Sequence, residues 1–202
     1  MKVIAGACFA IFVCAGMGFA QPSFDCAKAQ GSVEELICAD AKLATLDLGM
    51  ANRYQAALAA AGGLEVGGQS AGDDLKAMQR GWIKGRDECW KADALRDCVE
   101  FAYQSREAEL VTRWMLEEPV STVFWTCEGN PANEVVTMFF ETSLPSIRFE
   151  HGDSIDTGLQ VRTASGAKYV GSFGRSIWMK GDMAMYRAPD PSGVELSCTK
   201  KP

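Results

Sequence analysis

The hydrophobic period of the chain changes between its first and second halves. Over residues 24–116, apolar side chains recur at steps of three, four and seven, the spacing of one helix face. After Glu117-Glu118-Pro119 they gather in short runs of strand type. We therefore predict a helical domain over 21–116, a linker over 117–122 and a β domain over 123–202. The first helix face consists of Leu36, Leu43, Leu46, Met50 and Tyr54.

Local signals divide the helical half into three helices. Ser32-x-x-Glu35 has the pattern of a capping box and predicts the first helix start. Gly62–Gly72 contains five glycines and predicts a flexible loop. Asp73 or Asp74 is expected to cap the second helix, and the third is expected from near Asp93. These elements predict a small helical hairpin bundle. Its remaining apolar positions are Leu75, Met78, Trp82 and Cys89, then Leu95, Val99, Tyr103, Leu110 and Trp114.

The second half contains eight short segments of strand type. Turn-forming groups such as Asn130-Pro131 and Lys180-Gly181-Asp182 separate them. Eight short strands in about 80 residues predict an antiparallel barrel or sandwich. The segments are 120–127, 135–141, 147–150, 158–163, 168–170, 176–179, 183–187 and 194–198.

The first residues have the pattern of an export signal. Lys2 precedes the apolar run Val3–Phe19, and Gly18-Phe19-Ala20 supplies small residues before a cut. We predict a signal peptide over 1–20 and a periplasmic or secreted protein. A retained membrane anchor is the alternative, and a lipoprotein is disfavoured because Val13 precedes Cys14 where a small residue is needed.

Six cysteines remain after that cut, and an even number in an exported chain favours disulfides. Zinc is disfavoured because the chain has no Cys-x-x-Cys pair and His151 is its one histidine. Cys127 on the first strand and Cys198 on the last would staple the β domain. The helical half allows three pairings; we favour the local pairs Cys26–Cys38 and Cys89–Cys98, which close short segments.

Charge and motifs argue against several function classes. The chain has 20 basic and 26 acidic residues, a net charge of −6, which disfavours nucleic acid and permits a basic partner. Ser165-x-x-Lys168 lacks the partner motifs of a penicillin-binding enzyme, and a single histidine in a turn argues against a catalytic triad. We predict no enzyme, no catalytic residue and no metal. Arg86 and Asp87 are expected to form a local ion pair of little energetic value if exposed.

The helical half carries a long spaced pattern of cysteines and aromatic residues. It begins at Phe24-Asp25-Cys26, continues through Ile37-Cys38 and Gln79-x-x-Trp82, and ends at Tyr103-x-x-Arg106. This pattern resembles the LprI N-terminal family of exported helical domains. The resemblance implies a disulfide-stapled helical fold, and one family member is linked to lysozyme inhibition.

The second half carries Trp125-Thr126-Cys127, Ala164–Tyr169, Trp178–Asp182 and Cys198. These segments resemble the MliC family, inhibitors of C-type lysozyme that fold as eight-stranded antiparallel barrels. In that family a serine and a lysine enter the enzyme's cleft, and the matching residues here are Ser165 and Lys180. Supporting positions are Gly166, Tyr169, Trp178 and Gly181. Two departures are Ile177 in place of an aromatic residue and a segment between Ser165 and Lys180 that is one residue longer.

Together these observations predict an α+β protein of two domains that binds C-type lysozyme non-covalently and needs no cofactor. The alternative is a cell-envelope module that binds peptidoglycan or another exported protein.

Overall fold

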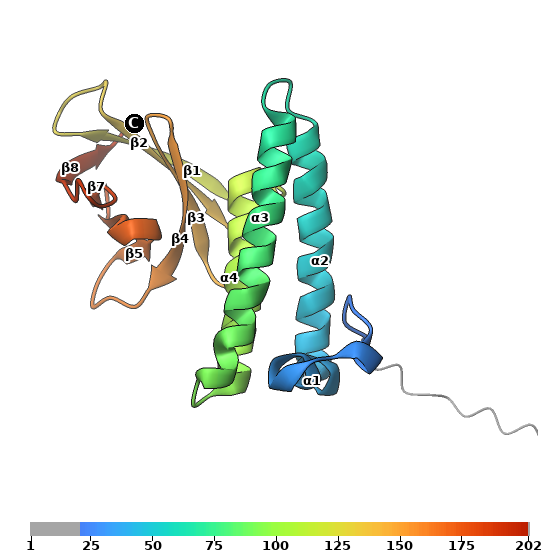
Figure 1. The fold of residues 1–202 in the computed structure, drawn as a ribbon. Helices are drawn as coiled ribbons and strands as arrows, with labels where there is room; N and C mark the ends of the chain where they lie inside the picture. The colour runs from blue at the N-terminus through green and yellow to red at the C-terminus, as the bar shows by residue number, and fades with distance from the viewer. Residues whose placement is uncertain (1–20, 202) are drawn as a thin grey trace, which may run out of the picture.

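A computed structural model describes residues 21–201, so the expected signal peptide lies outside the described residues. Four helices pack beside a closed barrel of eight strands (Figure 1). The predicted fold class, a disulfide-containing helical domain followed by an eight-stranded antiparallel barrel, is therefore confirmed. The helices are α1 (Gly31–Ala39), α2 (Ala41–Gly62), α3 (Gly68–Asp87) and α4 (Leu95–Trp114), with short 3₁₀ turns η1 (Cys26–Lys28), η2 (Glu88–Lys91) and η3 (Ser172–Gly174).

The predicted first helix is two helices, because a second N-cap interrupts it. The Asp40 carboxylate accepts hydrogen bonds from the amides of Lys42 and Leu43 at 2.9 and 3.1 Å, which starts α2. The predicted Ser32 capping box is also wrong. Helix α1 begins at Gly31, and the Glu34 carboxylate accepts the amide of its N-cap residue Gln30 at 2.7 Å.

The glycine-rich connection is much shorter than predicted. Helix α3 begins at Gly68, so Asp73 and Asp74 lie inside it and do not cap it. Gly67 is the N-cap residue and has φ +75°, a conformation that glycine adopts readily. A Cβ at Gly68 would lie 2.8 Å from the carbonyl oxygen of Ala61. The glycines therefore permit a tight α2–α3 turn, and tertiary packing overrides their low helix propensity.

A buried polar network joins α2, α3 and α4. The Tyr103 hydroxyl donates to the Asp47 carboxylate at 2.8 Å and accepts from the Arg86 guanidinium at 2.9 Å. Arg86 also donates to the carboxylate of Asp87 at 2.7 Å. The expected Arg86–Asp87 pair exists, but Arg86 is buried, which the local sequence pattern did not indicate. Around this network lies the apolar core, which includes Ile37, Leu43, Leu75, Val99 and Leu110.

The barrel strands pair in sequence order, and the last returns to the first. Each neighbouring pair is antiparallel, and β1 with β8 closes the sheet. The predicted strand 158–163 begins at Ser154 instead, because Ser154 pairs with His151 across a two-residue turn. The strands are β1 (Ser121–Cys127), β2 (Glu134–Phe140), β3 (Ser146–His151), β4 (Ser154–Val161), β5 (Ala167–Val170), β6 (Ser176–Lys180), β7 (Met183–Arg187) and β8 (Glu195–Lys200).

Alternating side chains fill the barrel. Trp125, Phe149, Ile177 and Tyr186 are among the inward residues that are almost fully buried. The Cys127–Cys198 disulfide joins β1 to β8 at the closing seam. In the helical domain the disulfides join Cys26 to Cys38 and Cys89 to Cys98.

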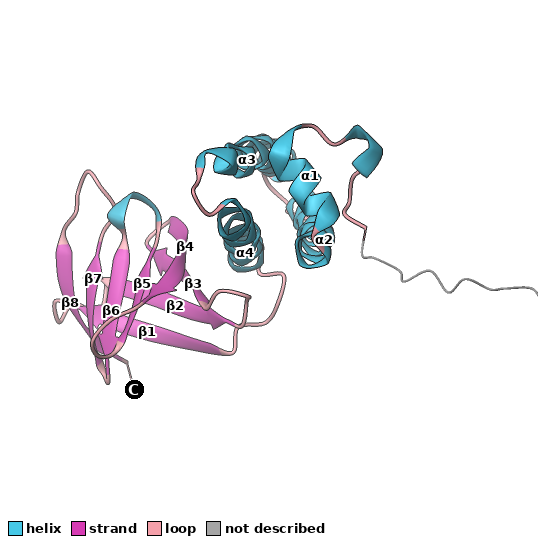
Figure 2. Cartoon of the chain, turned by 90° about the horizontal axis from the view of Figure 1, so that it is seen from below, coloured by secondary structure: helices cyan, strands magenta, loops and turns pink. Residues whose placement is uncertain are grey.

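Helix α4 packs against β2, β3 and β4 and connects the two domains. Arg148 on β3 donates to the carbonyl oxygen of Arg113 at 2.8 Å, at the end of α4. The hydroxyls of Thr112 and Thr157 lie 2.6 Å apart across the same interface. Figure 2 shows β6, β7 and β8 on the side of the barrel away from the helices. The helical domain therefore leaves that side uncovered.

Candidate functional site

Ser165 and Lys180 lie in neighbouring loops at one end of the barrel. Ser165 belongs to the connection between β4 and β5, and Lys180 ends β6 before the turn Gly181-Asp182. Strand β5 pairs with β6 so that Ala167 lies opposite Met179. Because antiparallel neighbours run in opposite directions, the chain before Ala167 comes level with the chain after Met179. The pairing register therefore brings Ser165 and Lys180 to the same rim.

Hydrogen bonds hold the Ser165 loop against β6. The Trp178 indole Nε1 donates to the carbonyl oxygen of Ser165 at 2.9 Å. The Thr163 hydroxyl is within 3.2 Å of the same oxygen and 3.1 Å of the Gly166 carbonyl oxygen. Trp178 and Lys180 are two residues apart on β6 and face the same side of the sheet. Trp178 thus links the backbone of one site residue to the strand that carries the other.

Glycine is needed at both turns for different reasons. Gly166 has φ +71°, and a Cβ there would lie 2.3 Å from the Met179 carbonyl oxygen. That position requires both the left-handed conformation and close approach of the loop to β6. Gly181 has φ +60° with open space around it, so only its turn conformation favours glycine.

Both site side chains are exposed. Among the residues 21–201 that the structure describes, the Ser165 hydroxyl and the Lys180 ammonium form no hydrogen bond or ion pair with another group. An alcohol and a cation that remain solvated in the free protein are available to a partner. Their availability does not depend on breaking an internal contact.

The remaining predicted site residues have different surroundings. Tyr169 is buried in the barrel core, and its ring meets Phe139 edge-on at 5.7 Å between centroids. Burial raises the pKa of its phenol. Trp178 contacts the Ser165 loop through Nε1, yet its side chain is 44% exposed. Tyr169 therefore supports the barrel from inside, whereas Trp178 lies on its surface.

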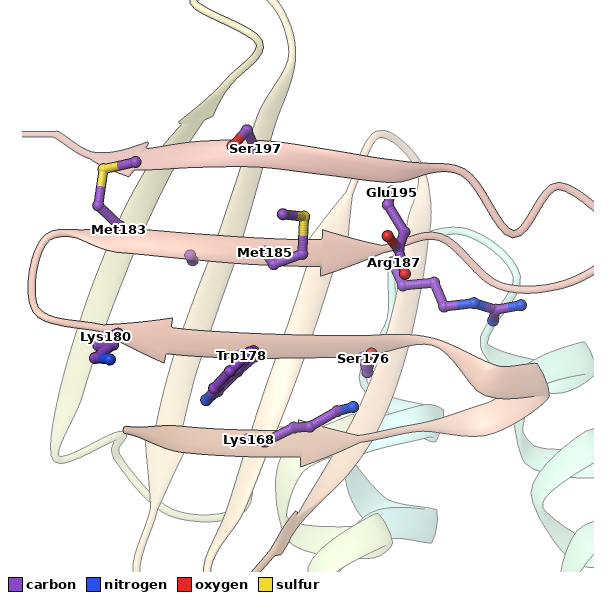
Figure 3. Close-up of a pocket in the computed structure, with 10 residues that line it drawn as sticks. Lys168, Ser176, Trp178, Lys180, Met183, Met185, Arg187, Glu195 and Ser197 are labelled. Carbon is purple, nitrogen blue, oxygen red and sulfur yellow. The ribbon is translucent and has the colours of Figure 1, made fainter. Parts of the chain in front are cut away.

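A hollow of about 440 Å³ lies on the outer face of β5–β8 and includes Lys180 at one end (Figure 3). Trp178, Met183 and Met185 contribute its apolar lining. No local sequence pattern marks the two methionines; in the structure they alternate with the buried residues Ala184 and Tyr186 and face outward. The other lining residues are Lys168, Ser176, Ala184, Arg187, Glu195 and Ser197.

The described residues offer neither a metal centre nor a membrane-spanning helix. Over 21–201, no three or more His, Cys, Asp or Glu side chains are grouped so that they could hold a metal ion. None of the helices in this range is long and apolar enough to cross a bilayer.

Comparison with known proteins gives matches in both domains. A family model described as "Lysozyme inhibitor LprI" matches residues 26–118. A second, described as "Membrane-bound lysozyme-inhibitor of c-type lysozyme" (MliC), matches residues 125–194. The chain is 30% identical over 158 residues to "Lipoprotein LprI" of Mycobacterium bovis, covering 77% of this chain and 74% of that protein. The same values hold for "Lipoprotein LprI" of Mycobacterium tuberculosis. The two families expected from the sequence are therefore confirmed, in the expected order.

Proposed function

Because this chain belongs to the LprI family and matches the MliC model over residues 125–194, we propose that it is an exported inhibitor of C-type lysozyme. In this proposal Ser165 and Lys180 enter the enzyme's active-site cleft and block it without forming a covalent bond. The observation that carries the proposal is the common rim of these two residues, where both are exposed and the Ser165 loop is held by Trp178.

The chemistry of the target explains why an alcohol and an ammonium suit it. A lysozyme cleaves its substrate with two carboxyl groups about 5 Å apart, one protonated and one ionised. Covering an ionised carboxylate without a partner costs several kcal/mol. The Lys180 ammonium is a compact cation with three donors that can pair with the ionised group. The Ser165 hydroxyl donates and accepts, so it can bond a carboxyl group in either state.

Overall charge supports the same partner. The chain has a net charge of −6, and C-type lysozymes are typically basic. Opposite net charges accelerate association at low ionic strength. The local cation at Lys180 then meets the acidic residues inside an otherwise basic enzyme. Binding of this kind needs no cofactor.

An inhibition titration with the full chain tests the proposal. The parent protein is expected to inhibit a C-type lysozyme acting on cell walls, and Lys180→Ala is expected to weaken inhibition. Loss of a buried charged contact costs about 2–5 kcal/mol, a thirtyfold or larger rise in the inhibition constant. Lys84→Ala on α3 is the matched control, since it removes an exposed lysine from the helical domain. Equal inhibition by parent and Lys180→Ala would exclude this mechanism.

A further inference from the structure

The outer face of β5–β8 is more apolar than a solvated sheet face should be. The outward positions of an antiparallel sheet are normally polar. Here Trp178 is 44%, Met183 53% and Met185 41% exposed, and all three line one hollow. Figure 3 shows their side chains on neighbouring strands of that face. We call the surface formed by Lys168, Trp178, Met183, Met185 and Ser197 the Trp178 face.

These residues lie side by side through strand pairing. Trp178 on β6 pairs with Met185 on β7 and with Lys168 on β5. Met185 in turn pairs with Ser197 on β8. Contiguous exposed apolar surface on a soluble domain commonly marks an interaction site. Tryptophan and methionine are enriched in protein interfaces, and tryptophan is frequent among the residues that dominate binding energy.

The Trp178 face is continuous with the proposed lysozyme site. Lys180 lines the same hollow and pairs with Met183 across the β6–β7 turn. The Trp178 indole donates a hydrogen bond to the Ser165 carbonyl oxygen. A protein that binds Lys180 and Ser165 in its cleft must therefore come within contact distance of the Trp178 ring.

Interface size points to the same conclusion. A stable protein interface buries about 800 Å² on each partner and involves roughly 20–30 residues a side. The loop between β4 and β5 and the β6–β7 turn contribute only residues 162–166 and 181–182. Together with Lys180 these are eight residues, which is too few, so further surface must take part. The Trp178 face is the adjoining uncovered apolar surface, since the helices pack against β2–β4.

Charge indicates the chemistry of the partner. Within the described chain, Lys168 and Lys180 form no ion pair. At the far end of the hollow, Arg187 is paired with Asp190 and lies opposite Glu195 on β8. Two unpaired cations on a protein of net charge −6 favour an acidic partner surface here. The carboxyl-bearing cleft of a lysozyme has this character.

We infer that the Trp178 face binds C-type lysozyme directly beside its catalytic cleft, so that the interface comprises a sheet face as well as two rim loops. This inference rests on the proposed function and extends it. The partner segment that covers Trp178 and Met185 is the wall of the cleft. Met185 contributes flexible apolar contact, and Trp178 both contacts the enzyme and holds the Ser165 loop.

Methionine oxidation measures the contact without any substitution in the chain. Hydroxyl-radical labelling of the full chain, alone and with excess lysozyme, compares Met183 and Met185 with Met78 and Met115. The latter two lie in or beside the helical domain and are 40% and 41% exposed, which matches Met185. Lysozyme is expected to lower oxidation of Met183 and Met185 at least threefold and to leave Met78 and Met115 unchanged. Equal oxidation of all four in an inhibited complex would overturn the inference.

A charge substitution supplies an independent test. Met185→Glu is expected to raise the inhibition constant at least tenfold, because a carboxylate would replace an apolar contact and face the acidic partner surface. Ile155→Glu on β4, where the side chain is 44% exposed, is the matched control and should change it less than twofold. Thermal unfolding of both variants checks that they fold.

The outcomes separate this inference from the proposed function. If Lys180→Ala weakens inhibition and Met185→Glu does not, the interface is confined to the loops and the inference is wrong, while the proposed function stands. If the parent does not inhibit lysozyme, both are wrong. Loss of a dimer in sedimentation, or of capture on insoluble peptidoglycan, caused by Met185→Glu with inhibition unchanged would assign the face to another occupant and overturn the inference.

Discussion

Arg148 of barrel strand β3 donates a hydrogen bond to the carbonyl oxygen of Thr112 in helix α4, at 3.2 Å. The last carbonyl groups of a helix have no partner within the helix and carry partial negative charge. A guanidinium suits that position because it is a cation with several donors. The barrel therefore caps the helix that precedes it, and a buried polar contact joins the two domains.

Removal of that contact should destabilise the protein. In Arg148→Ala, the carbonyl oxygens of Thr112 and Arg113 lose their interdomain donor, and Glu150 loses its ion partner at 2.6 Å. We expect a loss of about 3 kcal/mol in the free energy of unfolding, measured by denaturant titration. Arg113→Ala removes the same charge from an exposed neighbouring side chain and should cost less than about 0.5 kcal/mol. Equal effects of the two substitutions would show that the capping contact contributes nothing.

Trp178→Phe should separate the two roles of this residue. Phenylalanine keeps an aromatic ring but removes the Nε1 donor to the Ser165 carbonyl oxygen. One such hydrogen bond contributes about 0.5–1.5 kcal/mol. We expect faster amide hydrogen exchange in residues 163–166 and inhibition weakened three- to tenfold. Trp90→Phe, on an exposed tryptophan of the helical domain, should change neither quantity. Unchanged exchange in the loop of Trp178→Phe would contradict a positioning role.

The sequence predicts the architecture well because both halves have a clear hydrophobic period. The apolar runs around Ile177 and Tyr186 predict strands there, although only the barrel shows that these two side chains point inward. Element boundaries were predicted less well where tertiary contacts decide them. Asp40 interrupts a continuous apolar face, and Gly68 enters a helix because its backbone packs closely against Ala61. The helix propensities of individual residues predict neither effect.

The candidate site was predictable only in part. Ser165 and Lys180 were identified through family resemblance, and the pairing of Ala167 with Met179 explains how they reach one rim. Met183 and Met185 were missed, because exposed methionines in a strand have no distinguishing local pattern. Their grouping with Trp178 depends on the pairing of β6 with β7. Burial of Arg86 was missed for the same reason, since Asp47 and Tyr103 lie far from it in sequence.

Alkaline pH should destabilise the helical domain through Tyr103. Burial raises the pKa of its phenol, whereas an unfolded tyrosine titrates near pH 10. The folded state therefore holds this proton more tightly, and its stabilising contribution is present below pH 10 and lost as the pH rises above that value. The loss approaches about 1.4 kcal/mol per pH unit. Denaturant titrations between pH 8 and 11 measure it.

Tyr103→Phe tests the assignment of that dependence. The substitution removes one partner from each of Asp47 and Arg86 and should cost about 1–3 kcal/mol at pH 8. Its stability should then fall less steeply than that of the parent above pH 10. Equal slopes in the parent and Tyr103→Phe would assign the alkaline sensitivity to other groups, such as Tyr169 and Tyr186, whose pKa values burial also raises.

Two of the disulfides should differ in value because they close loops of very different length. Cys127 and Cys198 are 71 residues apart, whereas Cys89 and Cys98 are 9 apart. In the chain-entropy relation these separations correspond to about 4 and about 3 kcal/mol.

Removal of the Cys127–Cys198 bridge by paired alanine substitution should also weaken the seam where β1 meets β8, and β8 borders the strand that carries Met183 and Met185. We therefore expect loss of the Cys127–Cys198 bridge to lower the unfolding free energy more than loss of the Cys89–Cys98 bridge. The variant without Cys127–Cys198 should also lose lysozyme inhibition at a lower temperature than the variant without Cys89–Cys98. Calorimetry and inhibition assays on both double variants measure this order. A larger loss of stability in the variant without Cys89–Cys98 would show that the β1–β8 seam is held chiefly by strand pairing and core packing.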